Sequence, residues 1–119
     1  GKVGLMYPSD YGYATSGGST TDRATCLNTV LYNWNDSDAF DCRNNDWLFY
    51  DNNDNGQWTL TPGAISLAAT IAGIIDETGS GNGSEVSNSH GVRPVVYLTS
   101  NVGISGGEGT SESPFELSL

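Results

Sequence analysis

The sequence predicts one small domain that combines a single amphipathic helix with several short β-strands. Its 119 residues carry no internal repeat and no second composition regime, which favours a single domain over residues 1–119. Sixteen glycines indicate many turns, whereas three Trp, six Tyr and three Phe supply more hydrophobic material than a disordered chain carries. We therefore expect a folded, turn-rich domain with a small core.

The charge balance excludes two classes of partner. Fourteen Asp and Glu oppose four Lys and Arg, so the net charge is −10. Nucleic acids and anionic membranes repel such a surface, and we expect neither as a partner of this fragment. No apolar run approaches the roughly 20 residues that cross a bilayer. Because the chain opens at Gly1 without a Met or a signal peptide, we expect a trimmed ectodomain whose targeting segment lies upstream.

The first half of the chain predicts one strand and one helix. Residues 3–7 alternate apolar side chains up to Pro8 and suit a short strand, and residues 9–19 suit a loop. The best helix runs from Asp22, with that residue or one of the two threonines before it as the N-cap. Its apolar residues follow i, i+3, i+4, i+7 spacing, namely Leu27, Val30, Leu31 and Trp34.

The second half predicts short strands. Aromatic strands cover 47–50 and 58–62. Segment 65–75 is ambiguous, because its alanines suit a helix whereas its β-branched residues suit strands around a turn at Gly73, which we favour. Residues 78–89 are typical of a loop. The β-branched run 92–98 is the strongest strand candidate and indicates a central position, and the tail 101–119 contains a turn at Gly106, Gly107 and Gly109.

Cys26 and Cys42 are the only cysteines, and fifteen residues separate them. A structural zinc site needs four ligands, and His90 is the one other soft candidate. A disulfide is therefore the favoured reading, with two buried free thiols as the alternative. An even cysteine count in an acidic chain with few lysines favours an oxidising, extracellular setting.

The segment 51–56 matches the first half of a calcium-binding loop. Asp51, Asn53 and Asn55 would supply oxygen ligands at alternate positions, and Gly56 would allow the sharp turn. Pro62 stands where the bidentate glutamate belongs, and no pair of helices brackets the segment. The favoured alternative is an Asx-rich turn, so we expect no cofactor beyond this candidate calcium.

A second motif, Trp34-Asn35-Asp36, spells a tripeptide that calcium-dependent lectins use to coordinate a sugar-binding calcium. In those lectins it lies on a late strand, whereas here it ends the predicted helix. We expect Trp34 to be a core residue and the match to be coincidental.

His90 is the only histidine, and histidine is the commonest general base in enzymes. A Ser/His/Asp triad can be written from the composition, but the chain lacks a Gly-x-Ser-x-Gly elbow and a phosphate-binding loop. We expect no enzyme activity, with a small hydrolase that uses His90 as the weaker alternative.

Several motifs together resemble one family of exported bacterial domains. They are Trp58-Thr59-Leu60-Thr61-Pro62 and Gly91-Val92-Arg93-Pro94-Val95, joined by the opening 2–14, the cysteine spacing, Asn45-Asp46-Trp47-Leu48 and the ending 106–117. The chain is similar to the C-terminal ectodomains of pilin-like proteins of gut Firmicutes, in which a type IV pilin helix precedes the domain. The resemblance implies a C-type-lectin-like (formylglycine-generating-enzyme-like) α+β domain with one or two helices and a twisted antiparallel sheet.

The resemblance also implies a location and structural roles. It places the domain outside the cell, on the surface or on a pilus, with other filament subunits or a cell-surface glycan or protein as partners. Trp47 and Trp58 would fill the core, and Arg93 would pair with a carboxylate such as Asp46. The related enzymes use a cysteine- and metal-based site, which the predicted disulfide leaves no thiols to form.

Adhesion or ligand recognition is the predicted function, and a filament subunit that contacts only its neighbours is the main alternative. Binding is expected on loops 50–57 and 63–73, where polar and aromatic groups flank the sheet. The candidate ligand-binding residues are Tyr50, Asp51, Asn53, Asn55, Ser66 and Thr70.

Overall fold

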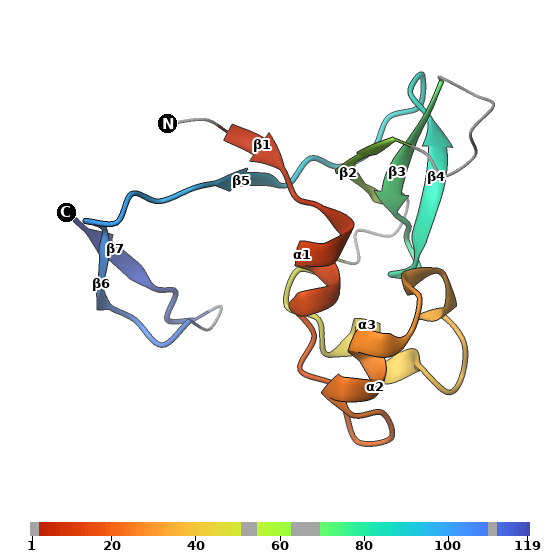
Figure 1. Ribbon diagram of the computed structural model, residues 1–119, viewed down its shortest axis with the longest axis horizontal. Helices are drawn as coiled ribbons and strands as arrows, with labels where there is room; N and C mark the ends of the chain where they lie inside the picture. The colour runs from red at the N-terminus through yellow and green to blue at the C-terminus, as the bar shows by residue number, and fades with distance from the viewer. Residues whose placement is uncertain (1–2, 51–54, 63–69, 110–111) are drawn as a thin grey trace.

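The computed structural model describes residues 3–50, 55–62, 70–109 and 112–119. Figure 1 shows a body of short helices beside a sheet, a two-stranded ladder, and a C-terminal hairpin that extends away from both. The helices are α1 (Pro8–Tyr13), α2 (Arg23–Asn28), the 3-10 turn η1 (Leu31–Asn33) and α3 (Phe40–Asn44). The strands are β1 (Val3–Leu5), β2 (Gln57–Pro62), β3 (Ile71–Ile75), β4 (Gly81–Glu85), β5 (Pro94–Val96), β6 (Gly103–Gly106) and β7 (Glu116–Ser118).

Three antiparallel sheets organise these strands: β1–β5, β2–β3–β4 and β6–β7. Together with the helices they confirm an α+β domain with antiparallel sheets. Within the described residues, no helix has the length and apolar character that crossing a membrane requires.

The predicted helix from Asp22 to Trp34 is interrupted. Of the three N-cap candidates, Asp22 is the one observed, because its side chain accepts a hydrogen bond of 2.7 Å from the Thr25 amide. Helix α2 nevertheless ends at Asn28, and Thr29 is extended. The β-branched pair Thr29-Val30 disfavours continuation of the helix, and the chain resumes as η1 before Trp34 enters the core.

Helix α1 lies where the sequence predicted a loop. Pro8 occupies its first turn, and the Asp10 carboxylate accepts a hydrogen bond of 2.8 Å from the Tyr7 amide. Both features are signals for the start of a helix. The helix is too short for its apolar residues to show a helical period in the sequence. The prediction of a loop over 9–19 is therefore wrong for its first five residues.

The disulfide between Cys26 and Cys42 is confirmed and joins α2 to α3, with 5.5 Å between the two Cα atoms. Both cysteines are fully buried in the main core, which also contains Met6, Tyr11, Ala14, Trp34, Ala39, Leu48 and Ile75. Trp34 is a core residue as predicted. Trp47, in contrast, is 75% exposed, because the adjacent Leu48 takes the buried position, so its predicted core role is wrong.

Strand β3 runs straight through Gly73, so the turn predicted there is wrong. Gly73 pairs with Gly83 of β4, and its carbonyl accepts a hydrogen bond of 2.9 Å from the Thr59 hydroxyl. A Cβ at Gly73 would lie 2.9 Å from that hydroxyl oxygen, which explains the small residue. Strand β4 lies within residues 78–89, for which the sequence predicts a loop. Its Gly and Asn residues have low strand propensity, and the strand forms because it pairs with β3.

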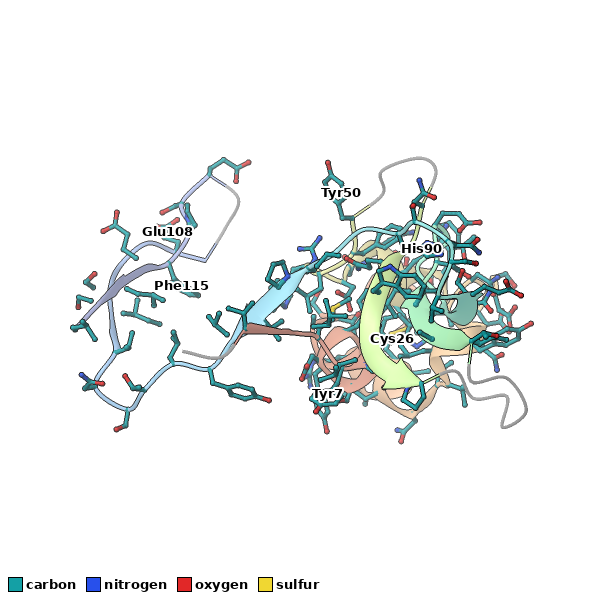
Figure 2. All side chains as sticks on the ribbon, turned by 90° about the horizontal axis from the view of Figure 1, so that it is seen from above. Tyr7, Cys26, Tyr50, His90, Glu108 and Phe115 are labelled. Atoms are coloured by element: carbon teal, nitrogen blue, oxygen red, sulfur yellow. A yellow bond between two sulfur atoms is a disulfide. The ribbon has the colours of Figure 1, made fainter. Side chains whose placement is uncertain are left out.

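The strand predicted to be central is instead a short edge strand. β5 pairs with β1 only, in the register Val3 to Val96, and both of these valines are exposed. β5 continues into the hairpin, which lies away from the body in both views (Figures 1 and 2). The radius of gyration is accordingly 15.5 Å, against about 13.5 Å for a compact chain of this length.

Candidate functional site

A groove of about 500 Å³ separates the helical half of the body from the sheet. One wall comes from Pro8 and from residues 30–32, and the other comes from β2, β3 and β4. The described lining residues are uncharged: Pro8, Val30, Leu31, Tyr32, Thr59, Thr61, Pro62, Ile71, Gly73, Ile74, Gly81, Asn82 and Gly83. The groove therefore offers a largely apolar surface with three hydroxyls and one side-chain amide, which suits apolar side chains and not a charged ligand.

Glycines keep the sheet wall of this groove open. Gly81 and Gly83 alternate along β4, and Gly83 faces Gly73 across the ladder. A Cβ at Gly81 would lie 3.0 Å from the Leu31 Cβ atom, and one at Gly83 would lie 3.0 Å from the Ile71 side chain. Larger residues at these positions would press on the groove walls. The glycine spacing that gave no strand signal thus shapes the cleft.

Two clamps hold the groove walls at a fixed separation. The buried Tyr11 hydroxyl donates a hydrogen bond of 3.0 Å to the Gly79 carbonyl, and Arg43 donates one of 2.6 Å to the Thr78 carbonyl. Both bonds tie a helix to the β3–β4 turn, and burial raises the pKa of the Tyr11 hydroxyl well above its usual range. With the disulfide behind them, these contacts make the groove a preformed feature.

A second apolar surface lies on the C-terminal hairpin. Phe115, Leu117 and Leu119 alternate with Glu116 and Ser118, and Ile104 faces Leu117 across the ladder. This period of two is the pattern of a strand with one buried face. All four apolar side chains are nevertheless more than half exposed. The exposed fraction is 55% for Phe115, 52% for Leu117, 94% for Leu119 and 64% for Ile104. Figure 2 shows Phe115 on the hairpin, well away from the body.

A buried polar network lies around Asp46, whose side chain is 5% exposed. The carboxylate accepts a hydrogen bond of 2.8 Å from the Leu48 amide through Oδ1, whereas Oδ2 has no hydrogen-bond partner among the described residues. Burial raises the pKa of Asp46 to about 7, against the lowering effects of the Leu48 and Phe49 amides and the Arg93 charge. Asp46 therefore titrates near neutrality.

The predicted direct pairing of Arg93 with Asp46 is wrong. Arg93 Nε donates a hydrogen bond of 3.1 Å to the Gln57 side-chain oxygen, and the Gln57 amide donates one of 3.2 Å to the Leu48 carbonyl. Arg93 acts on Asp46 only through its electric field. The sequence identified both charged groups. It could not reveal that the Gln57 side chain bridges Arg93 and the Leu48 carbonyl.

Ser84 and His90 form the one catalytic-looking contact that the described residues show. His90 Nε2 lies 2.7 Å from the Ser84 hydroxyl oxygen, which also accepts a hydrogen bond from the Asn88 side chain. The Nδ1 atom of His90 is buried, with no hydrogen-bond partner among the described residues. A serine hydrolase needs a third group on that nitrogen to orient the ring, so the pair ties β4 to the loop before Gly91 without completing a triad. Trp58 packs edge to face against the His90 ring, with 4.7 Å between the two ring centroids. The structural role predicted for Trp58 is therefore this contact with His90.

The predicted loop residues are only partly placed. Tyr50 and Asn55 line a small pocket of about 310 Å³ beside Gln57 and Arg93. Thr70 is exposed at the start of β3, and its carbonyl accepts a hydrogen bond from the Val86 amide. Asp51, Asn53 and Ser66 lie outside the described residues, and so does most of the predicted calcium loop. Among the residues described, no cluster of three or more His, Cys, Asp or Glu side chains forms a metal site.

The sequence reading missed both apolar surfaces. The alternation from Phe115 to Leu119 was the available signal for the hairpin face, and the Gly81–Gly83 spacing was a weaker one for the groove. Comparisons with protein-family models, curated proteins and solved structures find no match for this chain. The resemblance to pilin-like, C-type-lectin-like ectodomains therefore stays a prediction.

Proposed function

We propose that this chain is a non-enzymatic, extracellular domain of a surface-displayed bacterial protein, and that it binds other macromolecules through apolar surface. The observation that carries the proposal is the exposed apolar face of the β6–β7 hairpin. Seven large apolar side chains between β5 and the C-terminus are more than half exposed: Val96, Tyr97, Leu98, Ile104, Phe115, Leu117 and Leu119. Exposed apolar side chains that gather on one strand face are typical of interaction sites.

The β6–β7 hairpin gains little stability from the pairing of its own two strands. A two-stranded ladder is marginally stable in water unless another element covers one face. The Phe115–Leu119 alternation provides such a face, and Figure 1 shows none of the body's described helices and strands against the hairpin. Covering the face by a partner would therefore stabilise the hairpin as well as the complex.

The disulfide supports the extracellular part of the proposal. Disulfides persist in secreted and surface proteins and are rare in the reducing cytosol. Cys26 and Cys42 are both fully buried, so their bond contributes stability within a small core. A pilin-like or adhesive surface protein is one setting that combines this chemistry with an exposed binding face.

A binding assay with matched variants tests this function. Beads that carry the wild-type domain are offered to mucin, to a glycan array, to epithelial cells and to beads of the same domain. We expect binding to at least one of these surfaces and its loss in the variant Leu117→Thr. Ser118→Thr, on the opposite face of the same strand, is the control and should bind as the wild type does. Equal binding by all three proteins, or none by the wild type, would refute the proposal.

A small hydrolase is the second candidate, and the 2.7 Å contact between Ser84 and His90 is the observation that favours it. Its test is labelling by a serine-directed fluorophosphonate probe. Labelling of the wild type that disappears in Ser84→Ala would establish the hydrolase, whereas absence of labelling under conditions that label a control esterase would remove it.

A further inference from the structure

The groove and the hairpin are two uncovered apolar surfaces of one chain. We propose that the β6–β7 hairpin of one copy docks in the groove of a second copy, so that copies join head to tail. The inference rests on the proposed function, because it takes the hairpin face as the binding surface and adds the identity of the partner. The donor and acceptor surfaces are described in turn below.

The hairpin is a preformed donor. Gly107 and Gly109 adopt left-handed backbone angles, with φ of 81° and 78°, which larger residues disfavour. The amides of Glu108 and Gly109 both donate hydrogen bonds of 2.9 Å to the Ser113 carbonyl. The Phe115 ring lies against Gly109, where a Cβ would come within 2.5 Å of it. Backbone that these described contacts already hold loses little conformational entropy on docking.

The groove is a suitable acceptor in size and in charge. A cleft of about 500 Å³ has the volume of a small-ligand site, so it accepts a few side chains of the hairpin face and not the entire hairpin. Two copies that each carry a net charge of −10 repel one another over most of their surface. The described groove lining carries no charge, and Glu116 points to the hairpin face opposite Phe115 and Leu117. Contact through these two surfaces therefore keeps the Glu116 carboxylate out of the interface and meets no charge on the described groove lining.

The area involved indicates a weak, transient interface. Complete burial of a large apolar side chain removes roughly 60–120 Å² from water, so the four hairpin side chains, which are 52–94% exposed, together offer roughly 160–320 Å². Standard interfaces bury about 800 Å² per partner. We therefore expect association in the micromolar range rather than a permanent dimer.

The geometry favours a second copy over the chain's own groove. The hairpin lies on the far side of the β1–β5 ladder from the β2–β3–β4 sheet (Figure 1). Strand β5, which leads into the hairpin, is held by its pairing with β1. Because the donor and acceptor are different surfaces, the contact is heterologous. Each bound copy leaves one hairpin and one groove free, so such a contact extends into an open chain of copies unless the rotation closes a ring.

Two uncharged variants and their mixture test the proposal. The hairpin variant is Ile104→Thr with Leu117→Thr, which keeps β-branched residues in the strands. The groove variant is Val30→Thr with Tyr32→Asn, at two exposed positions of the groove rim. Sedimentation velocity at concentrations up to about 200 µM, well above a micromolar Kd, should show growing oligomers for the wild type and monomers for each variant alone. An equimolar mixture should form heterodimers and nothing larger, because only one intact hairpin and one intact groove can meet.

Each other outcome has a definite meaning. A wild type that stays monomeric overturns the proposal, and it leaves the proposed function standing if the beads still bind mucin, glycans or cells. Association of the groove variant alone shows that hairpins pack on one another or on another surface, which also overturns it. Unchanged thermal unfolding guards against misfolding. Leu119→Thr, at a 94% exposed position, provides a second hairpin variant that leaves the fold intact and should weaken association at least several-fold.

Discussion

Ile104 and Leu117 face each other across the β6–β7 ladder, and both side chains are more than half exposed. Directly opposed residues of an antiparallel pair lie on one face of the ladder and stabilise it by contact with each other. Here the pair also begins an apolar face that continues through Phe115 and Leu119. A small acidic domain thus presents a hydrophobic strand pattern to its surroundings, and this relationship underlies the interaction that we propose.

Self-association should strengthen as salt is added. Two copies with a net charge of −10 repel each other, and salt screens that repulsion while leaving apolar contact intact. Raising the ionic strength from about 0.01 M to 0.15 M shortens the Debye length from about 30 Å to 8 Å. We expect the association constant, measured by sedimentation, to rise several-fold. A fall with added salt would indicate that ion pairs and not apolar side chains hold the copies together.

Loss of the disulfide should destabilise the domain by about 3 kcal/mol, the value for a loop of about fifteen residues. The measurement is urea unfolding of the oxidised protein against the double variant Cys26→Ala with Cys42→Ala. Mass spectrometry without reductant should show that both thiols of the wild type are blocked to alkylation. Two freely alkylated cysteines in protein isolated from its native setting would contradict the extracellular assignment.

Stability should depend on the ionisation of Asp46. Its pKa is about 7 in the folded state and 3.8 for an ordinary aspartate, so between pH 4 and 7 the folded protein holds a proton that the unfolded chain has lost. The contribution of Asp46 to stability is therefore complete below about pH 4, falls as the pH rises to 7, and stays low above it. Asp46→Asn keeps an oxygen acceptor for the Leu48 amide and removes the charge.

Urea unfolding of this variant and the wild type at two pH values measures the effect. We expect Asp46→Asn to be more stable than the wild type by roughly 4 kcal/mol at pH 8 and equal to it at pH 4. The lowered pKa values of Asp22 and Asp41 act in the opposite direction, through hydrogen bonds to their carboxylates, but both proteins share them. A difference that is the same at pH 4 and pH 8 would show that the charge of Asp46 is not its cause.

His90→Ala should lower stability without changing binding. The substitution removes the edge-to-face contact with Trp58 and the bond to Ser84, for a loss of about 1–2 kcal/mol. Ser84 keeps its hydrogen bond from Asn88, so β4 should remain in place. Thermal unfolding and the bead assay give the two readouts. Binding that disappears in a folded His90→Ala protein would mean that the active surface lies at this end of β4.

The sequence predicted some elements from local patterns, although the strand predicted over residues 47–50 is wrong, since these residues adopt a turn and irregular backbone. The Asp22 N-cap, strands near 3–5 and 57–62, the buried Trp34 and the disulfide follow from residue type and spacing. It failed where tertiary contacts decided the outcome. Strand β4 forms on β3 despite its glycines, and Gln57 takes the place that the charge pattern assigned to Asp46.

The candidate site was only indirectly predictable. The alternation from Phe115 to Leu119 indicates a half-covered strand, but a one-dimensional pattern cannot say that none of the described helices and strands of the body covers it. The groove is harder still, because its walls come from five segments that meet only in three dimensions. Loop residues chosen for polarity, such as Tyr50 and Asn55, line a smaller pocket instead.

Hydrogen–deuterium exchange of the wild type at a low and a high protein concentration tests the central claim most directly. The account predicts slower exchange at high concentration in two separated places, the β6–β7 hairpin and the groove strands β3 and β4, with unchanged exchange in the disulfide-linked helices α2 and α3. Exchange that is identical at both concentrations throughout the hairpin, in protein concentrated well above a micromolar Kd, would contradict it.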